Sequence, residues 1–270
     1  MSYTTFIRNR RQFLLGSSAA SLAALLPRRL DAHLAQQQAP VLEIPSRDTT
    51  LKFNPGGTRR AFAGNTVICH LPQRCRTRDA ITALGDALRR SSFVNKLGVL
   101  PSDSYHMTVF PGANDLERDT DTWPADIPID APIAQCNQII GQRMEAFRTH
   151  TELPFRISID LERTLAYGRA CTLRIVPADE AENTKLRTLR DRLSDVYRFR
   201  AKDHATYEFH VTVAYQMKPF TPQEQKQYRA LLEQHLPLII ATAPVIELGI
   251  PEYCTFEDMY RFEIRTLLRS

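Results

Sequence analysis

Residues 105–110 read YHMTVF and residues 209–214 read FHVTVA, so the element His-x-Thr-Val occurs twice in this chain. Side chains alternate between the two faces of a β-strand. In each copy the imidazole and the threonine hydroxyl therefore share one face, about 7 Å apart along the strand, and the apolar residues share the other. The pattern predicts two strands that each turn an apolar side to the core and a polar side to a site.

Two such strands facing one cleft would bring together His106, Thr108, His210 and Thr212. A neutral imidazole accepts a proton from an attacking hydroxyl or water, and a protonated imidazole gives one to a leaving oxygen. The ordinary histidine pKa of about 6.5 suits both tasks. The two threonine hydroxyls donate hydrogen bonds to phosphate oxygens, where negative charge develops in the transition state. The quartet predicts acid–base cleavage of a phosphodiester, with no metal and no cofactor.

Each motif ends a similar unit of strand, helix and strand. Runs of β-branched and apolar residues that stop at a proline predict the first strands, and leucines at helical spacing predict the helices. The first unit comprises a strand at 66–71, a helix from an N-cap at Thr77 to 91 and a strand at 104–110; the second comprises a strand at 171–176, a helix at 186–196 and a strand at 207–214.

Further elements are expected around these units, and their mixed order favours an α+β fold over a doubly wound parallel sheet. They are a helix at 137–147, a strand at 155–161, a helix at 222–236 and strands at 244–248 and 259–267. Residues 36–64 are rich in Gln, Pro and Gly, which predicts a linker and a loop.

The paired stretches resemble the motifs of the 2H (two-histidine) phosphoesterase superfamily, which includes RNA 2′,3′-cyclic phosphodiesterases, 2′-5′ RNA ligases and an snRNA-trimming exonuclease. The resemblance implies a bilobal, duplicated fold in which two antiparallel sheets line a central cleft and the helices lie outside. It also implies that the two histidines and two threonines of the motifs are catalytic. We therefore expect one phosphoesterase domain with two pseudo-symmetric lobes over residues 41–270.

One position departs from the family pattern. Several members carry a basic residue shortly after the second motif, whereas this chain has Tyr215 followed by Gln216. The missing cation argues against a long polyanionic RNA as substrate. Tyr215 is a candidate for hydrogen bonding to the substrate or stacking on a base, with packing inside the fold as the equal alternative. Tyr105 and Phe110, which flank the first motif, are further candidates for substrate binding.

The first 40 residues have the parts of an export signal and a linker. A basic start precedes a mildly apolar stretch at 13–26 and a region of small residues. Residues 9–14 (NRRQFL) resemble a twin-arginine signal. Export to the periplasm is expected, with a mitochondrial-type presequence and a plain membrane anchor as the alternatives.

The formal charge of +5 is concentrated in the same segment. The first 35 residues contain five of the 35 basic residues and one of the 30 acidic ones, so the rest of the chain carries a balance of +1. This near-neutral body gives no case for a phosphate-backbone binder. We expect no stable nucleic-acid complex, no membrane association after signal removal, and a monomer. The five cysteines form an odd set without C-x-x-C spacing, which excludes a zinc ribbon or a thioredoxin-like protein.

Several other polar residues lack a repeated context and are expected to have structural roles. The histidines of this group, expected at the surface or satisfied in the core, are His70, His150, His204 and His235. The arginines expected on the solvent-exposed face of the second helix are Arg187, Arg190 and Arg192. The acidic segment at 115–130 is expected to be a solvated loop rather than a lid or cation site, because its spacing does not match a calcium loop.

The leading hypothesis is an exported hydrolase that opens a 2′,3′-cyclic phosphodiester on a nucleotide or short oligonucleotide. The near-neutral body, the export signal and Tyr215 favour such small substrates. An RNA-end processing or 2′-5′ ligase-like enzyme is the alternative within catalysis. A nucleotide-binding module that has kept the cleft without turnover is the alternative from another class.

Overall fold

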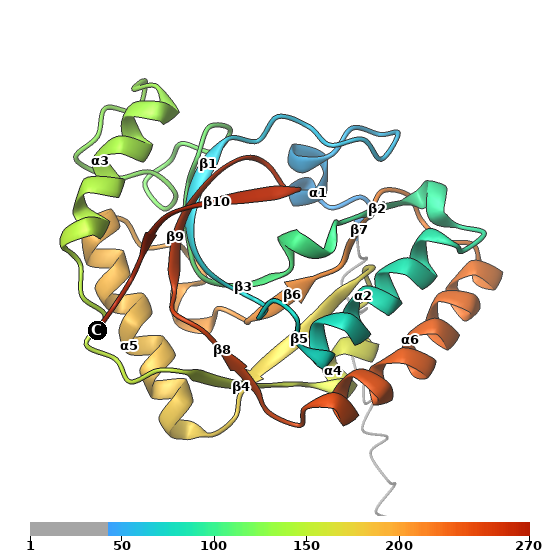
Figure 1. The fold of residues 1–270 in the computed structure, drawn as a ribbon. Coiled ribbons are helices and arrows are strands. Elements are labelled where there is room, and N and C mark those ends of the chain that lie inside the picture. Colours follow the sequence, from blue (N-terminus) through green and yellow to red (C-terminus); the bar gives the residue numbers. More distant parts are fainter. Residues whose placement is uncertain (1–42) are drawn as a thin grey trace, which may run out of the picture. The chain divides into compact units, whose positions relative to one another are not determined.

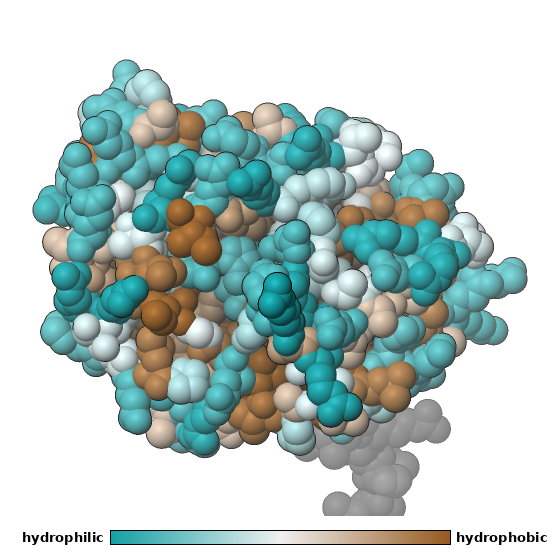
Figure 2. Space-filling view, in the orientation of Figure 1, coloured by the Kyte–Doolittle hydropathy of each residue, from teal (hydrophilic) through white to brown (hydrophobic). Residues whose placement is uncertain are grey.

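The structure is a computed structural model that describes residues 43–270 (Figure 1). The export signal expected at 1–40, with its twin-arginine stretch, lies outside the described residues. Among residues 43–270, no helix combines the length and the apolar character that a membrane crossing requires. Figure 2 shows one face of this region, on which hydrophilic residues predominate and apolar residues come to the surface in small groups.

Eight strands form one curled antiparallel sheet in the order β10-β9-β1-β3-β6-β5-β4-β8, and β2 pairs with β7 in a small second sheet (Figure 1). The strands of the large sheet are β1 (Gly64–His70), β3 (His106–Asn114), β4 (Phe155–Ile159), β5 (Thr172–Pro177), β6 (His210–Thr212), β8 (Ile246–Leu248), β9 (Glu252–Asp258) and β10 (Arg261–Leu267). The small sheet consists of β2 (Leu97–Val99) and β7 (Ala214–Gln216).

Within residues 43–270, six α-helices accompany the sheets: α1 (Arg47–Lys52), α2 (Arg76–Arg89), α3 (Ile133–Ala146), α4 (Leu161–Ala166), α5 (Glu180–Tyr197) and α6 (Pro222–Thr242). Helix α5 packs on β3, β4 and β5, and α3 packs on α5 and on the β1, β9 and β10 side of the sheet. Helices α2 and α6 lie side by side (Figure 1). The helices thus flank the sheets and leave one face of the motif strands open.

The amphipathic pattern of α2 is confirmed by burial. Ile81, Leu84 and Leu88 are buried as their helical spacing predicts. The N-cap is Cys75, whose Sγ accepts from a backbone N–H in the first turn, and the predicted cap Thr77 is instead a buried residue of that turn. The helix therefore begins at Arg76, earlier than a cap at Thr77 predicts.

The α+β class is confirmed, but the sheet arrangement differs from the expectation of two antiparallel sheets lining a cleft. Strand β1 covers one edge of β3, and β5 covers one edge of β6. The remaining edges of β3 and β6 pair with each other through Met107 and Val211, which joins both units in a single sheet. Pairing of two free strand edges provides hydrogen-bond partners for backbone N–H and C=O groups that would otherwise be unpaired. The duplicated, bilobal character of the domain stays a prediction.

The second motif strand is shorter than the range 207–214 predicts. It breaks at Val213, where the N–H groups of Val213 and Ala214 both donate to the Cys171 carbonyl, at 2.8 and 3.2 Å. After this irregularity the chain leaves the large sheet, and β7 pairs with β2. The first motif strand also differs from 104–110, because it begins at His106 and runs on to Asn114.

Several elements within residues 43–270 were not expected from the sequence. They include α1 inside the predicted linker, β2 before the first motif strand, α4 after β4, and strand β9 before β10. Helix α6 continues past Pro237 to Thr242, beyond the predicted end at 236, and the burial of Leu236 and Ile239 holds this last part against the core. Residues 115–130 contain no helix or strand, as expected, but the buried Trp123 anchors this loop.

Candidate active site

The two motif histidines begin neighbouring strands of the same sheet. His106 is the first residue of β3 and His210 the first residue of β6, and the strands pair antiparallel at Met107 and Val211. In this register each histidine lies across from the threonine of the other motif. The two histidines are then diagonal neighbours, a relation that separates residues by roughly 7–8 Å. This spacing allows both imidazoles to reach one phosphate.

A cavity of about 330 Å³ lies over this face of the two strands. All four predicted catalytic side chains and one predicted substrate contact line it: His106, Thr108, His210, Thr212 and Tyr215. The alternation predicted from the motif is also seen in the burial, because Met107, Val109, Val211 and Val213 are buried on the opposite face. The structure thus brings the repeated motif together at a single site.

Each imidazole is held by a backbone carbonyl two residues earlier in its own chain segment. Nδ1 of His106 donates to the Ser104 carbonyl at 2.6 Å, and Nδ1 of His210 donates to the Glu208 carbonyl at 2.9 Å. A carbonyl oxygen only accepts, so Nδ1 carries the proton in both rings. Both histidines therefore adopt the same tautomer, with Nε2 as the nitrogen available for proton transfer in the cavity.

The surroundings of both histidines disfavour the protonated ring. Desolvation lowers the pKa of His106 to about 3, against the opposing hydrogen bond to the Ser104 carbonyl, and the charge of Lys52 acts in the same direction as desolvation. Desolvation also lowers the pKa of His210, with contributions from Arg174 and Lys52. Both rings are thus neutral at pH 7 before substrate binds. An anionic substrate that favours the imidazolium form would restore a proton to one of them.

A cation that sequence reasoning missed lies on the wall of this cavity. Lys52, the last residue of α1, places Nζ 2.7 Å from Asp48 Oδ1 and 5.4 Å from the ring centroids of both Phe62 and Tyr215. Burial acts to lower the pKa of Lys52, but Asp48 and Tyr215 outweigh it and raise the pKa, so the ammonium stays charged. The positive charge absent after the second motif is thus supplied from the N-terminal side of the domain.

The signal that could have found Lys52 is a short helix pattern within the predicted linker. Ser46 caps α1 with its side chain, and Asp48 and Lys52 form an ion pair one helical turn apart. Such a cap followed by an i,i+4 pair predicts a helix start. The surrounding Gln-, Pro- and Gly-rich residues hide this pattern.

Two tyrosines accompany the two motif threonines. The phenol of Tyr215 interacts with Thr212 and Lys52, and burial raises its pKa, so it remains a neutral hydrogen-bonding group. The phenol of Tyr207 interacts with Thr108 and also lines the cavity. Tyr215 therefore lies on the cavity wall beside a motif threonine, and Tyr207 is a further cavity residue that sequence reasoning missed. The only sequence signal for Tyr207 was its place just before the second motif.

The structure corrects the prediction that Tyr105 and Phe110 contact substrate. Tyr105 is buried in the core, because it lies on the opposite face of its strand from His106. The register of β3 against β1 shifts between Thr108 and Phe110, which also turns Phe110 to the core. There its ring stacks on Tyr197 with 4.8 Å between centroids. Neither residue lines the cavity.

Arg190 is not on a wet helix face as expected, but fully buried behind the motif strands. It lies one turn after Leu186, on the core face of α5, where a charged residue breaks the amphipathic pattern. Its guanidinium donates to the Val109 carbonyl at 2.6 Å and lies over the Tyr207 ring at 4.0 Å from the centroid. Arg190 thus supports the strand and the tyrosine that flank the first motif.

Among the other histidines, His150 is exposed, as expected. His204 is buried with Nε2 2.9 Å from Asp191 Oδ1, but its Nδ1 has no partner among the described residues, so it is only partly satisfied. His70 differs, because it pairs in register with His106 across β1 and β3, and the two ring centroids are 6.2 Å apart. A third histidine therefore lies directly beside the catalytic candidates.

Comparison with known proteins supports the family resemblance. Residues 52–166 match the family described as "2H-phosphodiest: Domain of unknown function (DUF1868)". No curated protein matches the chain. The fold is similar to the crystal structure of a conserved protein of unknown function from Agrobacterium tumefaciens, with 28% sequence identity, a TM-score of 0.74, and coverage of 83% of this chain and 93% of that chain. The family match over residues 52–166 and the paired motifs around one cavity together support a relation of this chain to the 2H phosphoesterase superfamily.

Proposed function

We propose that this protein hydrolyses cyclic phosphodiesters, namely 2′,3′-cyclic nucleotides or the cyclic ends of short oligonucleotides. The family match supports a phosphoesterase or ligase-like activity in general. The single observation that carries the specific proposal is the pair of imidazoles with the same free nitrogen on one cavity. Two such groups can move both protons that hydrolysis of a phosphodiester requires.

In the proposed reaction, one neutral histidine takes a proton from water as the water oxygen bonds to phosphorus. The bond between phosphorus and one ribose oxygen breaks, and the other histidine, as imidazolium, protonates that oxygen. Thr108 and Thr212 donate hydrogen bonds to the non-bridging oxygens, and the Lys52 ammonium offsets the charge that develops on them. The chemistry needs no metal, since both proton transfers and the charge stabilisation come from side chains.

The cavity favours a small substrate. Its volume of about 330 Å³ lies at the lower end of the range for small-ligand sites. Phe62, Phe256 and Phe262 form part of its wall and offer aromatic surface on which a base can stack. We propose that the protein acts as a monomer on such nucleotides, without a stable nucleic-acid complex, and that it is exported through the twin-arginine route indicated by residues 9–14. Outside the cytoplasm, scavenged nucleotides would be the accessible substrates.

The proposal is tested by incubating purified protein with each 2′,3′-cyclic nucleotide in EDTA and separating the products by chromatography. We expect conversion to a nucleoside monophosphate at a rate that chelation does not change. Binding of the nucleotides without turnover would instead identify a binding module. Activity that disappears in EDTA would contradict the proposed side-chain chemistry.

The lowered histidine pKa values predict an acidic optimum. The imidazolium form of the general acid is lost as pH rises through its pKa, and both pKa values lie below the ordinary 6.5. A phosphodiester keeps one negative charge over this range, so the protein groups determine the profile. We expect kcat/KM to decrease steadily as pH rises above 6.5 and to be highest at a more acidic pH. Steady-state rates from pH 4 to 9 check this, and a maximum above pH 7 would contradict it.

A further inference from the structure

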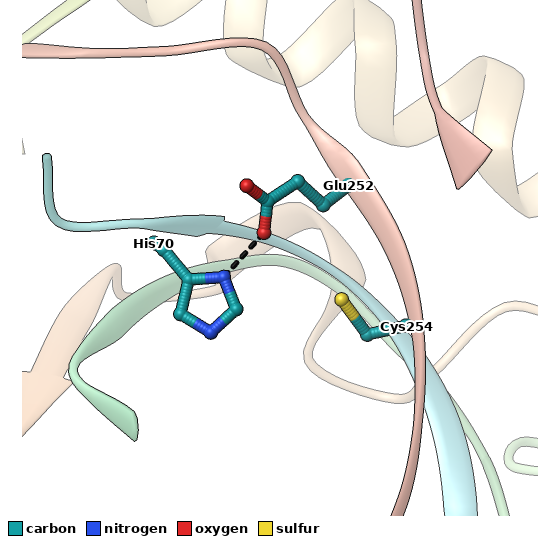
Figure 3. A group of neighbouring side chains, drawn as sticks. All are labelled: His70, Glu252 and Cys254. Carbon is teal, nitrogen blue, oxygen red and sulfur yellow. Dashed lines mark hydrogen bonds and ion pairs between the residues drawn. The ribbon is translucent and has the colours of Figure 1, made fainter. Parts of the chain in front are cut away.

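A second cluster of chemically active side chains lies beside the cavity, on strands β1 and β9. His70, Glu252 and Cys254 each offer one ligand atom, and these atoms all lie within 4.8 Å of one another (Figure 3). Glu252 and Cys254 are two residues apart on β9, so they share one face of the strand. His70 extends from the end of the paired neighbour β1. The three side chains therefore converge from two adjacent strands.

We propose that His70, Glu252 and Cys254 form a binding site for a divalent transition metal of the zinc class. An imidazole nitrogen, a carboxylate oxygen and a thiolate are the ligand types that Zn²⁺ prefers in proteins. The thiolate and the imidazole argue against Mg²⁺ or Ca²⁺, which prefer oxygen ligands throughout. Three protein ligands leave a fourth position for water.

The geometry needs little change to accept an ion. Nδ1 of His70 and Oε2 of Glu252 are in direct hydrogen-bond contact, and in Figure 3 the sulfur of Cys254 points towards this pair. A tetrahedral ion with bonds of about 2.0–2.3 Å holds its ligand atoms roughly 3.3–3.8 Å apart. Since the three atoms lie within 4.8 Å of one another, side-chain rotations can close the remaining gap. The metal would take the place of the proton between His70 and Glu252.

The three side chains of this site are mostly buried, but two of them remain accessible from one side. Cys254 is fully buried, whereas the side chains of His70 and Glu252 keep 14% and 15% of their exposure. A separate cavity of about 780 Å³ has His70 and Glu252 on its wall. This cavity provides a path for the ion and room for a water ligand.

Cys254 is buried beside the carboxylate of Glu252. A divalent ion bound between them would stabilise the thiolate and the carboxylate together.

The site is distinct from the catalytic pair. His106 Nδ1 is already bonded to the Ser104 carbonyl, and the edge of the Phe262 ring lies against the His106 ring at 4.4 Å between centroids. Phe262 lines both cavities and so lies between the two sites. Metal binding therefore does not depend on the proposed hydrolysis, and either proposal can fail without the other.

The test uses Co²⁺ as a spectroscopic probe on protein that has been treated with EDTA and returned to metal-free buffer. We expect one Co²⁺ per chain, with a sulfur-to-cobalt charge-transfer band in the near ultraviolet, and displacement of Co²⁺ by Zn²⁺. Cys254→Ser should abolish the band. Glu252→Gln and His70→Asn should weaken Co²⁺ binding at least tenfold, because each removes one of three ligands.

The controls separate this site from other thiols and histidines. Cys136→Ser replaces another buried cysteine, on α3, and should keep the band. His106→Asn and His210→Asn should bind Co²⁺ like the unmodified protein. The proposal is overturned if the unmodified protein shows no charge-transfer band, if Cys254→Ser retains it, or if a catalytic-histidine variant loses it. Should Cys254→Ser fail to fold by circular dichroism, unchanged binding to Glu252→Gln overturns the proposal equally.

Discussion

Replacement of His106 or His210 by asparagine is expected to lower kcat/KM for a 2′,3′-cyclic nucleotide by about 10²–10⁴-fold. Asparagine retains an amide that can donate to the backbone carbonyl behind each ring, but it cannot exchange a proton with substrate. Because the two histidines act in one reaction, the double variant should lose much less than the product of the two single effects. Steady-state kinetics on the three variants provides the measurement.

His150→Asn is the matched control for these variants. His150 is exposed and has a positive φ of 46°, a conformation that asparagine tolerates well, so the same substitution should leave both folding and turnover unchanged. The proposed mechanism would be wrong if His106→Asn and His210→Asn both retained the activity of the His150 variant.

Lys52→Met is expected to lower kcat by about 10²–10³-fold. Methionine keeps most of the side-chain length but removes the cation that faces developing charge on the phosphate. Because that charge increases in the transition state, the loss should appear more in kcat than in KM. Lys52→Arg should restore part of the rate, since it restores the positive charge.

Lys96→Met controls for the loss of a partly buried, ion-paired lysine. The Lys96 side chain is 19% exposed and pairs with Glu224, and the Lys52 side chain is 16% exposed and pairs with Asp48. Lys96 does not line the catalytic cavity. Equal rates for the two methionine variants would show that Lys52 contributes to folding alone and has no part in catalysis.

The catalytic face could be predicted because it depends on local alternation. The apolar residue between the histidine and threonine of each motif had to face the core, and this parity placed both pairs of polar side chains on the open side. The alternation of faces did not predict the position of Phe110, because the register shift between β1 and β3 adds one residue to β3. Such a shift depends on the partner strand and leaves no sequence signal of its own.

The residues that surround the motifs could not be predicted because they come from distant parts of the chain. Lys52 reaches the cavity from a six-residue helix that is too short to give a periodic pattern. Arg190 occupies a helix position at which its charge predicts exposure to solvent, but its guanidinium donates to the Val109 carbonyl and lies over the Tyr207 ring, while its Nε has no partner among the described residues. Long-range pairing of β3 with β6 depends on which strand edges the rest of the fold leaves free.

The direct pairing of β3 with β6 has a consequence for how the enzyme can move. In a site divided between two separately hinged bodies, opening and closing would change the distance between the acid and the base. Here the two strands pair directly at Met107 and Val211, so the separation of the two histidines is set by their diagonal positions within one sheet, roughly 7–8 Å. The two proposed proton-transfer groups are therefore held in place by one sheet, and we expect any gating of substrate to come from peripheral elements such as α1.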